Sequence, residues 1–195
     1  MLSKNLRPSK AEIAFLDQAY KKFYEIYRET LNDEFWEKDS YYRFFRIKTA
    51  FEIYAELLNY EPIKWEIKLI KKNRPPMEGE LGSELFKCIR NIFAHFPFFD
   101  SWNEVWINKL LINWYKEGQT IDRFLRKYVG KDEIHLRIWE GDKKQMTYLS
   151  ITFPNEYNDN TQIYLKDIMS EREGVKFSLI LMKKIIDTQL IHPNF

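Results

Sequence analysis

The chain has 195 residues, with 31 basic and 29 acidic side chains and a formal net charge of +2 at pH 7. This length fits one domain of ordinary size with a substantial hydrophobic core. The weak net charge permits RNA as a partner but does not indicate nucleic-acid binding as a long basic tail would, and a single cysteine excludes a disulfide scaffold.

That cysteine, Cys88, lies among apolar residues, so we expect a small buried side chain in a reducing, cytoplasmic setting. The first residues lack the apolar run of a signal peptide, and the apolar runs elsewhere are too short to span a membrane. We therefore expect a cytoplasmic protein with no membrane partner. No cysteines and histidines have zinc-ligand spacing, so we predict neither a metal nor a cofactor.

Aromatic residues make up 17% of the chain, and most of them recur at helical spacing. We interpret them as a bulky core rather than a base-stacking surface, because RNA-binding aromatics are few and interleaved with exposed basic residues. Ser9 followed three residues later by Glu12 is a capping box. It predicts a long amphipathic helix that continues to Leu31.

Two further helices follow the same spacing. The first begins at a cap at Asp39 or Ser40, ends before Pro62, and should pack antiparallel to the first helix. The second begins near Pro62 and ends before Pro75. One face of this second helix carries lysines, which are either solvated or a track for an RNA backbone.

Gly79 and Gly82 are expected to loosen the chain before a hydrophobic helix that ends at Pro97. Ser101 with Glu104 then forms a second capping box, which predicts a helix ending around Gly118. A short helix that stops at Gly130 completes the predicted helical bundle, which covers residues 9–130.

The pattern changes after Lys131. Alternation over residues 134–139 and the β-branched residues of 146–153 predict a β-hairpin with a turn at Gly141-Asp142. A third strand is expected near 163–168, and a final helix over 175–190. The predicted fold is mainly α, and α+β overall: a helical bundle over 9–130, followed by a hairpin or short meander and a C-terminal helix over 131–195. We expect the second part to pack on the bundle as one structural unit.

The C-terminal end of the hydrophobic helix brings together an arginine, an amide and a histidine. On an ideal helix its polar side carries Lys87, Arg90, Asn91, Ala94 and His95. Arginine forks onto phosphate oxygens, and histidine exchanges a proton near neutral pH. Because Arg90 and His95 are about 140° apart on the helical wheel, they flank a shallow notch that a substrate phosphate could bridge.

The segment Arg90-Asn91-Ile92-Phe93-Ala94-His95 resembles the motif of the HEPN family (higher eukaryotes and prokaryotes nucleotide-binding). The hallmark of this family is an arginine, four to six residues and a histidine, with a polar residue directly after the arginine. The architecture of residues 10–130, with antiparallel helices before the motif, agrees with that family.

The resemblance implies a metal-independent endoribonuclease, as in a toxin or defence effector. His95 would act as general base or acid around the ribose 2′-hydroxyl, Arg90 would hold the scissile phosphate, and Asn91 would orient the histidine or the phosphate. The implied partners are RNA or a nucleotide, a second copy of the chain that shares the cleft, and an antitoxin protein. The alternative is a noncatalytic HEPN-like module for nucleotide or RNA binding or for dimerisation. In that case Arg90 and Asn91 satisfy helix-end carbonyls or an acidic neighbour, and His95 caps the helix.

Three further basic residues are candidates for substrate binding. Lys87 precedes Arg90 by one helical turn, on the same face of the helix. Arg43 and Arg46 lie beside aromatic residues at the start of the predicted second helix and could contact RNA. An ordinary helix start with two exposed arginines explains the latter pair equally well.

Overall fold

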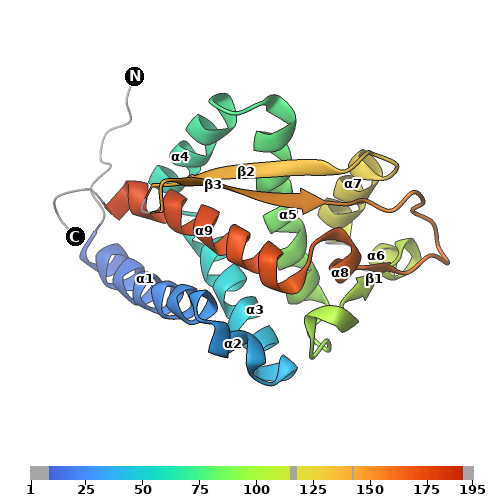
Figure 1. The fold of residues 1–195 in the computed structure, drawn as a ribbon, viewed down its shortest axis with the longest axis horizontal. Helices are drawn as coiled ribbons and strands as arrows, with labels where there is room; N and C mark the ends of the chain where they lie inside the picture. The colour runs from blue at the N-terminus through green and yellow to red at the C-terminus, as the bar shows by residue number, and fades with distance from the viewer. Residues whose placement is uncertain (1–8, 115–117, 142, 191–195) are drawn as a thin grey trace.

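The structure is a computed structural model, which describes residues 9–114, 118–141 and 143–190. Within these ranges it is mainly helical, with two small antiparallel sheets, so the predicted fold class is confirmed (Figure 1). The helices are α1 (Lys10–Leu31), α2 (Asp33–Glu37), α3 (Ser40–Leu57), α4 (Glu61–Lys72), α5 (Pro76–His95), α6 (Lys109–Trp114), α7 (Gln119–Tyr128), α8 (Leu165–Ile168) and α9 (Glu171–Leu190). No helix of the described part is long and apolar enough to cross a bilayer.

The first helices begin where the sequence predicts. The Ser9 hydroxyl accepts from the Glu12 amide at 3.2 Å, and the Glu12 carboxylate accepts from the Ser9 amide at 2.6 Å. The Asp39 carboxylate caps α3, because it accepts from the backbone amides of Tyr41 and Tyr42. Both caps satisfy amides that have no partner inside the helix. The short helix α2, which local spacing did not reveal, connects α1 to α3.

Helix α5 is longer than predicted, because Gly79 and Gly82 lie inside it instead of interrupting the chain. The helix begins at Pro76, and proline is tolerated in a first turn because its missing N–H has no partner there. A Cβ on Gly79 would lie 3.1 Å from the Lys71 Cα of α4. This glycine therefore permits close packing of two helices and does not break one.

The prediction of a capped helix from Ser101 is wrong. The Ser101 side chain makes no cap hydrogen bond, and a 3₁₀ turn (Trp102–Glu104) leads into strand β1 (Trp106–Ile107). Helix α6 starts later, where the Asn108 side chain accepts from the Leu111 amide at 2.7 Å. Because β1 is stabilised by pairing with a strand far along the chain, its local sequence gave no sufficient signal.

The partner of β1 is β4 (Ile163–Tyr164), with Trp106 opposite Tyr164. The expected third strand over 163–168 is therefore two residues long, continues into α8 instead, and does not extend the hairpin. The predicted hairpin itself is confirmed as β2 (Ile134–Glu140) and β3 (Gln145–Ile151), paired in register from Ile134 opposite Ile151. Asp142 of its predicted turn lies outside the described residues.

The C-terminal elements pack against the helices that precede them. Figure 1 shows the hairpin lying across α5 and α9, and the contacts place β2 on α5 and β3 on α9. Helix α9 begins at Glu171, four residues earlier than expected, and contacts α1, α3 and α4. Residues 191–195 of the predicted C-terminal part lie outside the described ranges.

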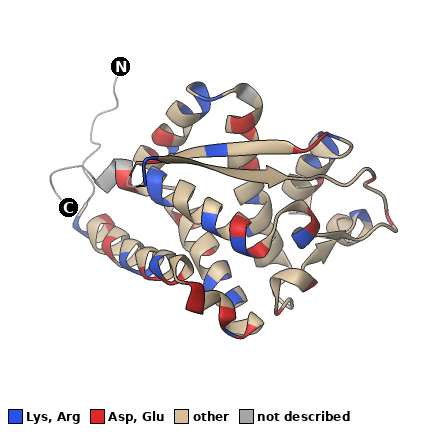
Figure 2. Cartoon of the chain, in the orientation of Figure 1, with Lys and Arg blue, Asp and Glu red and all other residues tan. Residues whose placement is uncertain are grey.

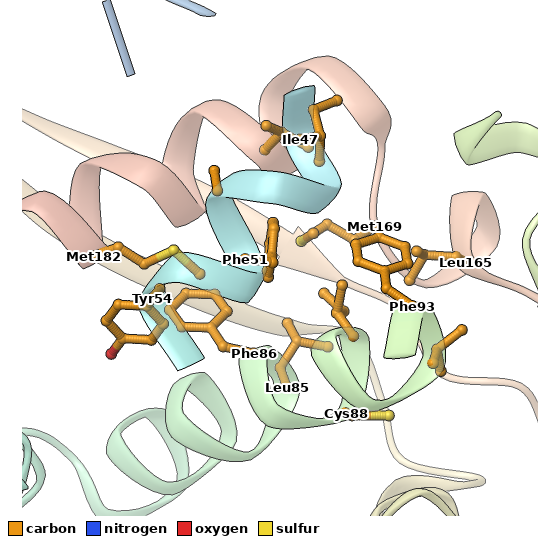
Figure 3. Close-up of a cluster of buried hydrophobic side chains, with 14 of the residues drawn as sticks. Ile47, Phe51, Tyr54, Leu85, Phe86, Cys88, Phe93, Leu165, Met169 and Met182 are labelled. Atoms are coloured by element: carbon orange, nitrogen blue, oxygen red, sulfur yellow. The ribbon is translucent and has the colours of Figure 1, made fainter. Parts of the chain in front are cut away.

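Aromatic rings of α5 and α3 form the centre of the core (Figure 3). The Phe93 ring meets Phe44 at 5.3 Å and Phe51 at 5.9 Å between ring centroids, in both cases edge to face. It also meets Trp102 at 6.2 Å, and the Trp102 indole N–H donates to the Met169 carbonyl at 3.0 Å. Phe93 is 1% exposed. The residue three places after Arg90 thus fixes the rotation of α5 about its axis.

Replacement of Phe93 by alanine removes these ring contacts and leaves a cavity, so the free energy of unfolding should fall by about 3–5 kcal/mol. Phe98→Ala is the control, because the Phe98 side chain is 61% exposed; we expect it to cost less than about 1 kcal/mol. Urea denaturation followed by circular dichroism measures both. Equal losses in the two variants would contradict a central role for Phe93.

Candidate functional site

The predicted motif lies at the C-terminal end of α5, and its polar strip is narrow. Lys87 and Ala94 are exposed, whereas Arg90 and His95 are half-buried. His95 is the last residue of the helix, and the helix closes as the Phe96 amide donates to the Ile92 carbonyl at 2.9 Å. Because an α-helix rises by about 1.5 Å per residue, His95 lies about 7.5 Å from Arg90 along the helix axis.

The prediction that Asn91 lies on the polar, exposed side of α5 is wrong, because its side chain is buried and only 7% of the residue is exposed. Helix α5 is contacted by α3, α4, α7 and β2, so little of its circumference reaches solvent. On the α7 side, Lys127 pairs with Glu84 of α5 at 2.9 Å, and the Tyr128 hydroxyl donates to the same carboxylate at 2.9 Å. The helical wheel identified the apolar side correctly but could not show which neighbours cover the other sides.

Arg90 carries a polar atom that the surrounding structure leaves unsatisfied. Its Nε is buried and has no hydrogen-bond partner among the described residues. An arginine keeps its charge in a protein, and a buried donor without an acceptor costs free energy. A phosphate oxygen supplies such an acceptor and also neutralises the guanidinium.

The two arginines of α3 have partners of a different kind. Arg43 forms a fork with Glu171 of α9, with Nε and Nη2 each 3.1 Å from a carboxylate oxygen, and also donates to the carbonyls of Trp36 and Lys38. The side chains of Arg43 and Glu171 are 16% and 15% exposed. The guanidinium of Arg43 therefore joins α3 to α9.

Arg46 is held in the same way by α1. It contacts both oxygens of Glu29 at 2.6 and 2.8 Å and one oxygen of Glu25 at 2.7 Å, and its side chain is 15% exposed. The expectation of two exposed arginines is wrong, because carboxylates from other helices cover both. The hydrogen bonds and ion pairs that hold these two guanidinium groups in the described ranges involve α1, α9 and the segment before α3, and none involves Arg90.

Cys88 is buried, as expected, and burial raises the pKa of its thiol far above the ordinary value. A thiol in this environment stays protonated at neutral pH and packs as a small apolar group. No group of three or more histidine, cysteine, aspartate or glutamate side chains is placed to hold a metal ion in the described ranges.

Sequence reasoning missed one polar group on α5. Glu78 lies 3.4 Å from Arg137 of β2, measured from Oε1 to Nε, and Arg74 donates from Nη1 to the Arg137 carbonyl at 2.7 Å. Glu78 and Arg74 line a pocket between α4, α5 and α9. The sequence interpretation assigned the region around Gly79 to a loosened segment, and no local signal connects it to a residue of the hairpin.

Charges of both signs alternate over the surface. Figure 2 shows acidic and basic residues interspersed along α1 and α9 rather than gathered into one basic face. This arrangement agrees with the small net charge of +2. Any contact with a polyanion therefore depends on a few local cations and not on the field of the whole molecule.

The chain matches no known family model, and no match was found among curated proteins or solved structures.

Arg43→Met should lower the free energy of unfolding by about 2 kcal/mol or more, because it leaves the nearly buried Glu171 carboxylate without its cation. The control is Arg126→Met, which breaks an exposed pair with Asp122 whose arginine side chain is 57% exposed. We expect this control to change stability by less than about 1 kcal/mol. Urea denaturation compares the two, and equal effects would argue against a structural role for Arg43.

Proposed function

We propose that the chain is a metal-independent endoribonuclease of the HEPN type, with Arg90 and His95 as its catalytic residues. The observation that carries this proposal is the Arg90 guanidinium, whose buried Nε has no partner within the described residues. The two other candidate arginines, Arg43 and Arg46, are paired with carboxylates. Arg90 is different because it lies on the helical strip that ends at a histidine.

In this proposal His95 removes the proton of a ribose 2′-hydroxyl, and the resulting oxygen attacks the adjacent phosphorus. The bond to the 5′-oxygen breaks, and that oxygen takes up a proton from water, giving a cyclic phosphate and a 5′-hydroxyl. Arg90 binds the non-bridging oxygens and stabilises the charge that develops on them. Lys87, one turn before Arg90 and exposed, adds a cation for the neighbouring phosphate.

The burial of Asn91 argues against direct contact of its side chain with RNA. An amide that is 7% exposed cannot reach far into a solvent-filled cleft. We assign it to positioning the end of α5 rather than to direct contact with RNA.

A second copy of the chain completes the proposed cleft. About 140° of rotation separates Arg90 from His95 on one helix, so the two side chains diverge. Two motif helices that face each other across a two-fold axis bring the arginine of one chain toward the histidine of the other. RNA would bind across both chains.

The cleavage test incubates single-stranded RNA with the purified protein in excess chelator. We expect cyclic-phosphate products, and a loss of about a hundredfold or more in rate for His95→Ala and for Arg90→Ala. Arg28→Ala on α1 and His135→Ala on β2 replace an exposed arginine and an exposed histidine outside the motif and should leave the rate unchanged. Activity that survives both motif substitutions, or that requires a divalent metal, would refute the proposal.

A mixing experiment tests the shared cleft. When the inactive His95→Ala and Arg90→Ala proteins are combined, heterodimers contain one intact arginine–histidine pair, so activity should partly return. Light scattering should give the mass of a dimer for the native chain. A strict monomer at high concentration, or no recovery on mixing two folded variants, would show that each chain acts alone.

The alternative function is a noncatalytic module that binds RNA or a nucleotide or that dimerises. The burial of Asn91 and the pairing of Arg43 and Arg46 favour it, since they leave a short basic strip at Lys87 and Arg90. Such a module would shift RNA in a gel without cleaving it. Arg90→Ala would then weaken binding, and His95→Ala would have little effect.

A further inference from the structure

A pocket lies where α4, α5 and α9 meet, at the other end of α5 from the motif. Its walls are mainly apolar, and it is open to solvent on one side. The wall residues are Tyr54, Ile67, Ile70, Phe86, Leu181 and Ile185. Tyr54 and Phe86 meet edge to face at 6.2 Å between ring centroids and lie beside each other at one end of the core cluster (Figure 3). Apolar walls with a few polar groups are typical of small-molecule sites.

Glu78 supplies an acceptor that the protein leaves unused. Its side chain is 15% exposed, and Oε1 is 3.4 Å from the Arg137 guanidinium. The other oxygen, Oε2, is buried and has no hydrogen-bond partner among the described residues. A buried carboxylate oxygen without a donor is costly, so a donor from a ligand would bind there favourably.

Two cations lie on the same pocket. Lys71 and Arg74 line it, and neither forms an ion pair with the described residues. Arg74 uses one nitrogen to donate to the Arg137 carbonyl. Burial lowers the pKa of Arg74, and the neighbouring Arg137 adds to this effect while Glu78 opposes it. An anion beside Arg74 would relieve both unfavourable contributions.

Gly82 keeps the pocket open. A Cβ at this position would meet only Leu181 Cδ2 within 4 Å, at 3.9 Å, which is an ordinary contact. Packing therefore does not require glycine here, although a glycine inside a helix costs about 0.5–1 kcal/mol relative to alanine. The missing side chain leaves space beside Glu78, one helical turn away.

We propose that this pocket binds a small zwitterion with an apolar body, namely an α-amino acid with an aliphatic side chain. Its ammonium group donates to Glu78 Oε2, its carboxylate accepts from Arg74 and Lys71, and its side chain lies against the apolar walls. A simple carboxylate leaves the Glu78 oxygen without a donor. A simple amine leaves Arg74 and Lys71 without an anion. The zwitterion satisfies both.

Titration calorimetry on the full chain tests this with leucine and two truncated analogues. The first, 4-methylpentanoate, lacks the ammonium group, and the second, 3-methylbutan-1-amine, lacks the carboxylate. We expect saturable binding of leucine, and binding about tenfold weaker or worse for each analogue, because each loses charge-assisted hydrogen bonds. Methionine and isoleucine extend the panel of aliphatic amino acids. If no amino acid of this panel binds, or if one analogue binds as tightly as leucine, the proposed ligand class is wrong.

Variants locate the site. Glu78→Gln should weaken leucine binding about tenfold or more by removing the charge, and Gly82→Leu should abolish it by filling the hollow. Glu80→Gln is the matched control, because Glu80 is exposed and pairs with Lys127 at 3.0 Å outside the pocket. Circular dichroism and thermal unfolding confirm that each variant folds. Binding that is unaffected in a folded Glu78→Gln protein, or weakened equally in Glu80→Gln, would overturn the assignment.

Discussion

The contact of Phe93 with the rings of α3 is the constraint on which the rest of the arrangement depends. This contact fixes the rotation of α5, since Phe93 meets Phe44 and Phe51 edge to face. Once that face is fixed, α7 and β2 close over other sides of the helix. The strip that remains open carries Lys87 and the half-buried Arg90. Aromatic packing thus determines which polar side chains of α5 are exposed to solvent, and their own polarity does not.

The arginines show how the same side chain acquires different roles. Arg43 and Arg46 each reach a carboxylate on another helix, and these pairs join α3 to α9 and to α1. A partly buried arginine loses hydration, and a bidentate contact with a carboxylate compensates for that loss. Arg90 has a buried Nε with no such compensation from the described residues. Buried polar groups without partners are rare in folded proteins, so this one needs an explanation beyond stability.

Local signals predicted the parts of the fold that local chemistry determines. The capping box at Ser9 and the alternation in β2 depend on residues a few positions apart, and both predictions are confirmed. The capping signal at Ser101 failed because the following residues pair with β4, more than fifty positions away. Of the candidate site, the sequence located the motif helix and its apolar face. It could not show the burial of Asn91, because the elements that contact α5 come from other parts of the chain.

The two unsatisfied polar atoms of α5 belong to separate sites. Glu78 and Arg90 are twelve residues apart, which corresponds to about 18 Å along a helix and about 120° around it. One small ligand cannot contact both atoms, so the two proposals concern different molecules. Their opposite charges lead to the same conclusion, because the carboxylate oxygen of Glu78 needs a donor whereas the guanidinium nitrogen of Arg90 needs an acceptor. A rigid helix held by Phe93 between them keeps both atoms in place without either ligand, so each site is preorganised by the same packing.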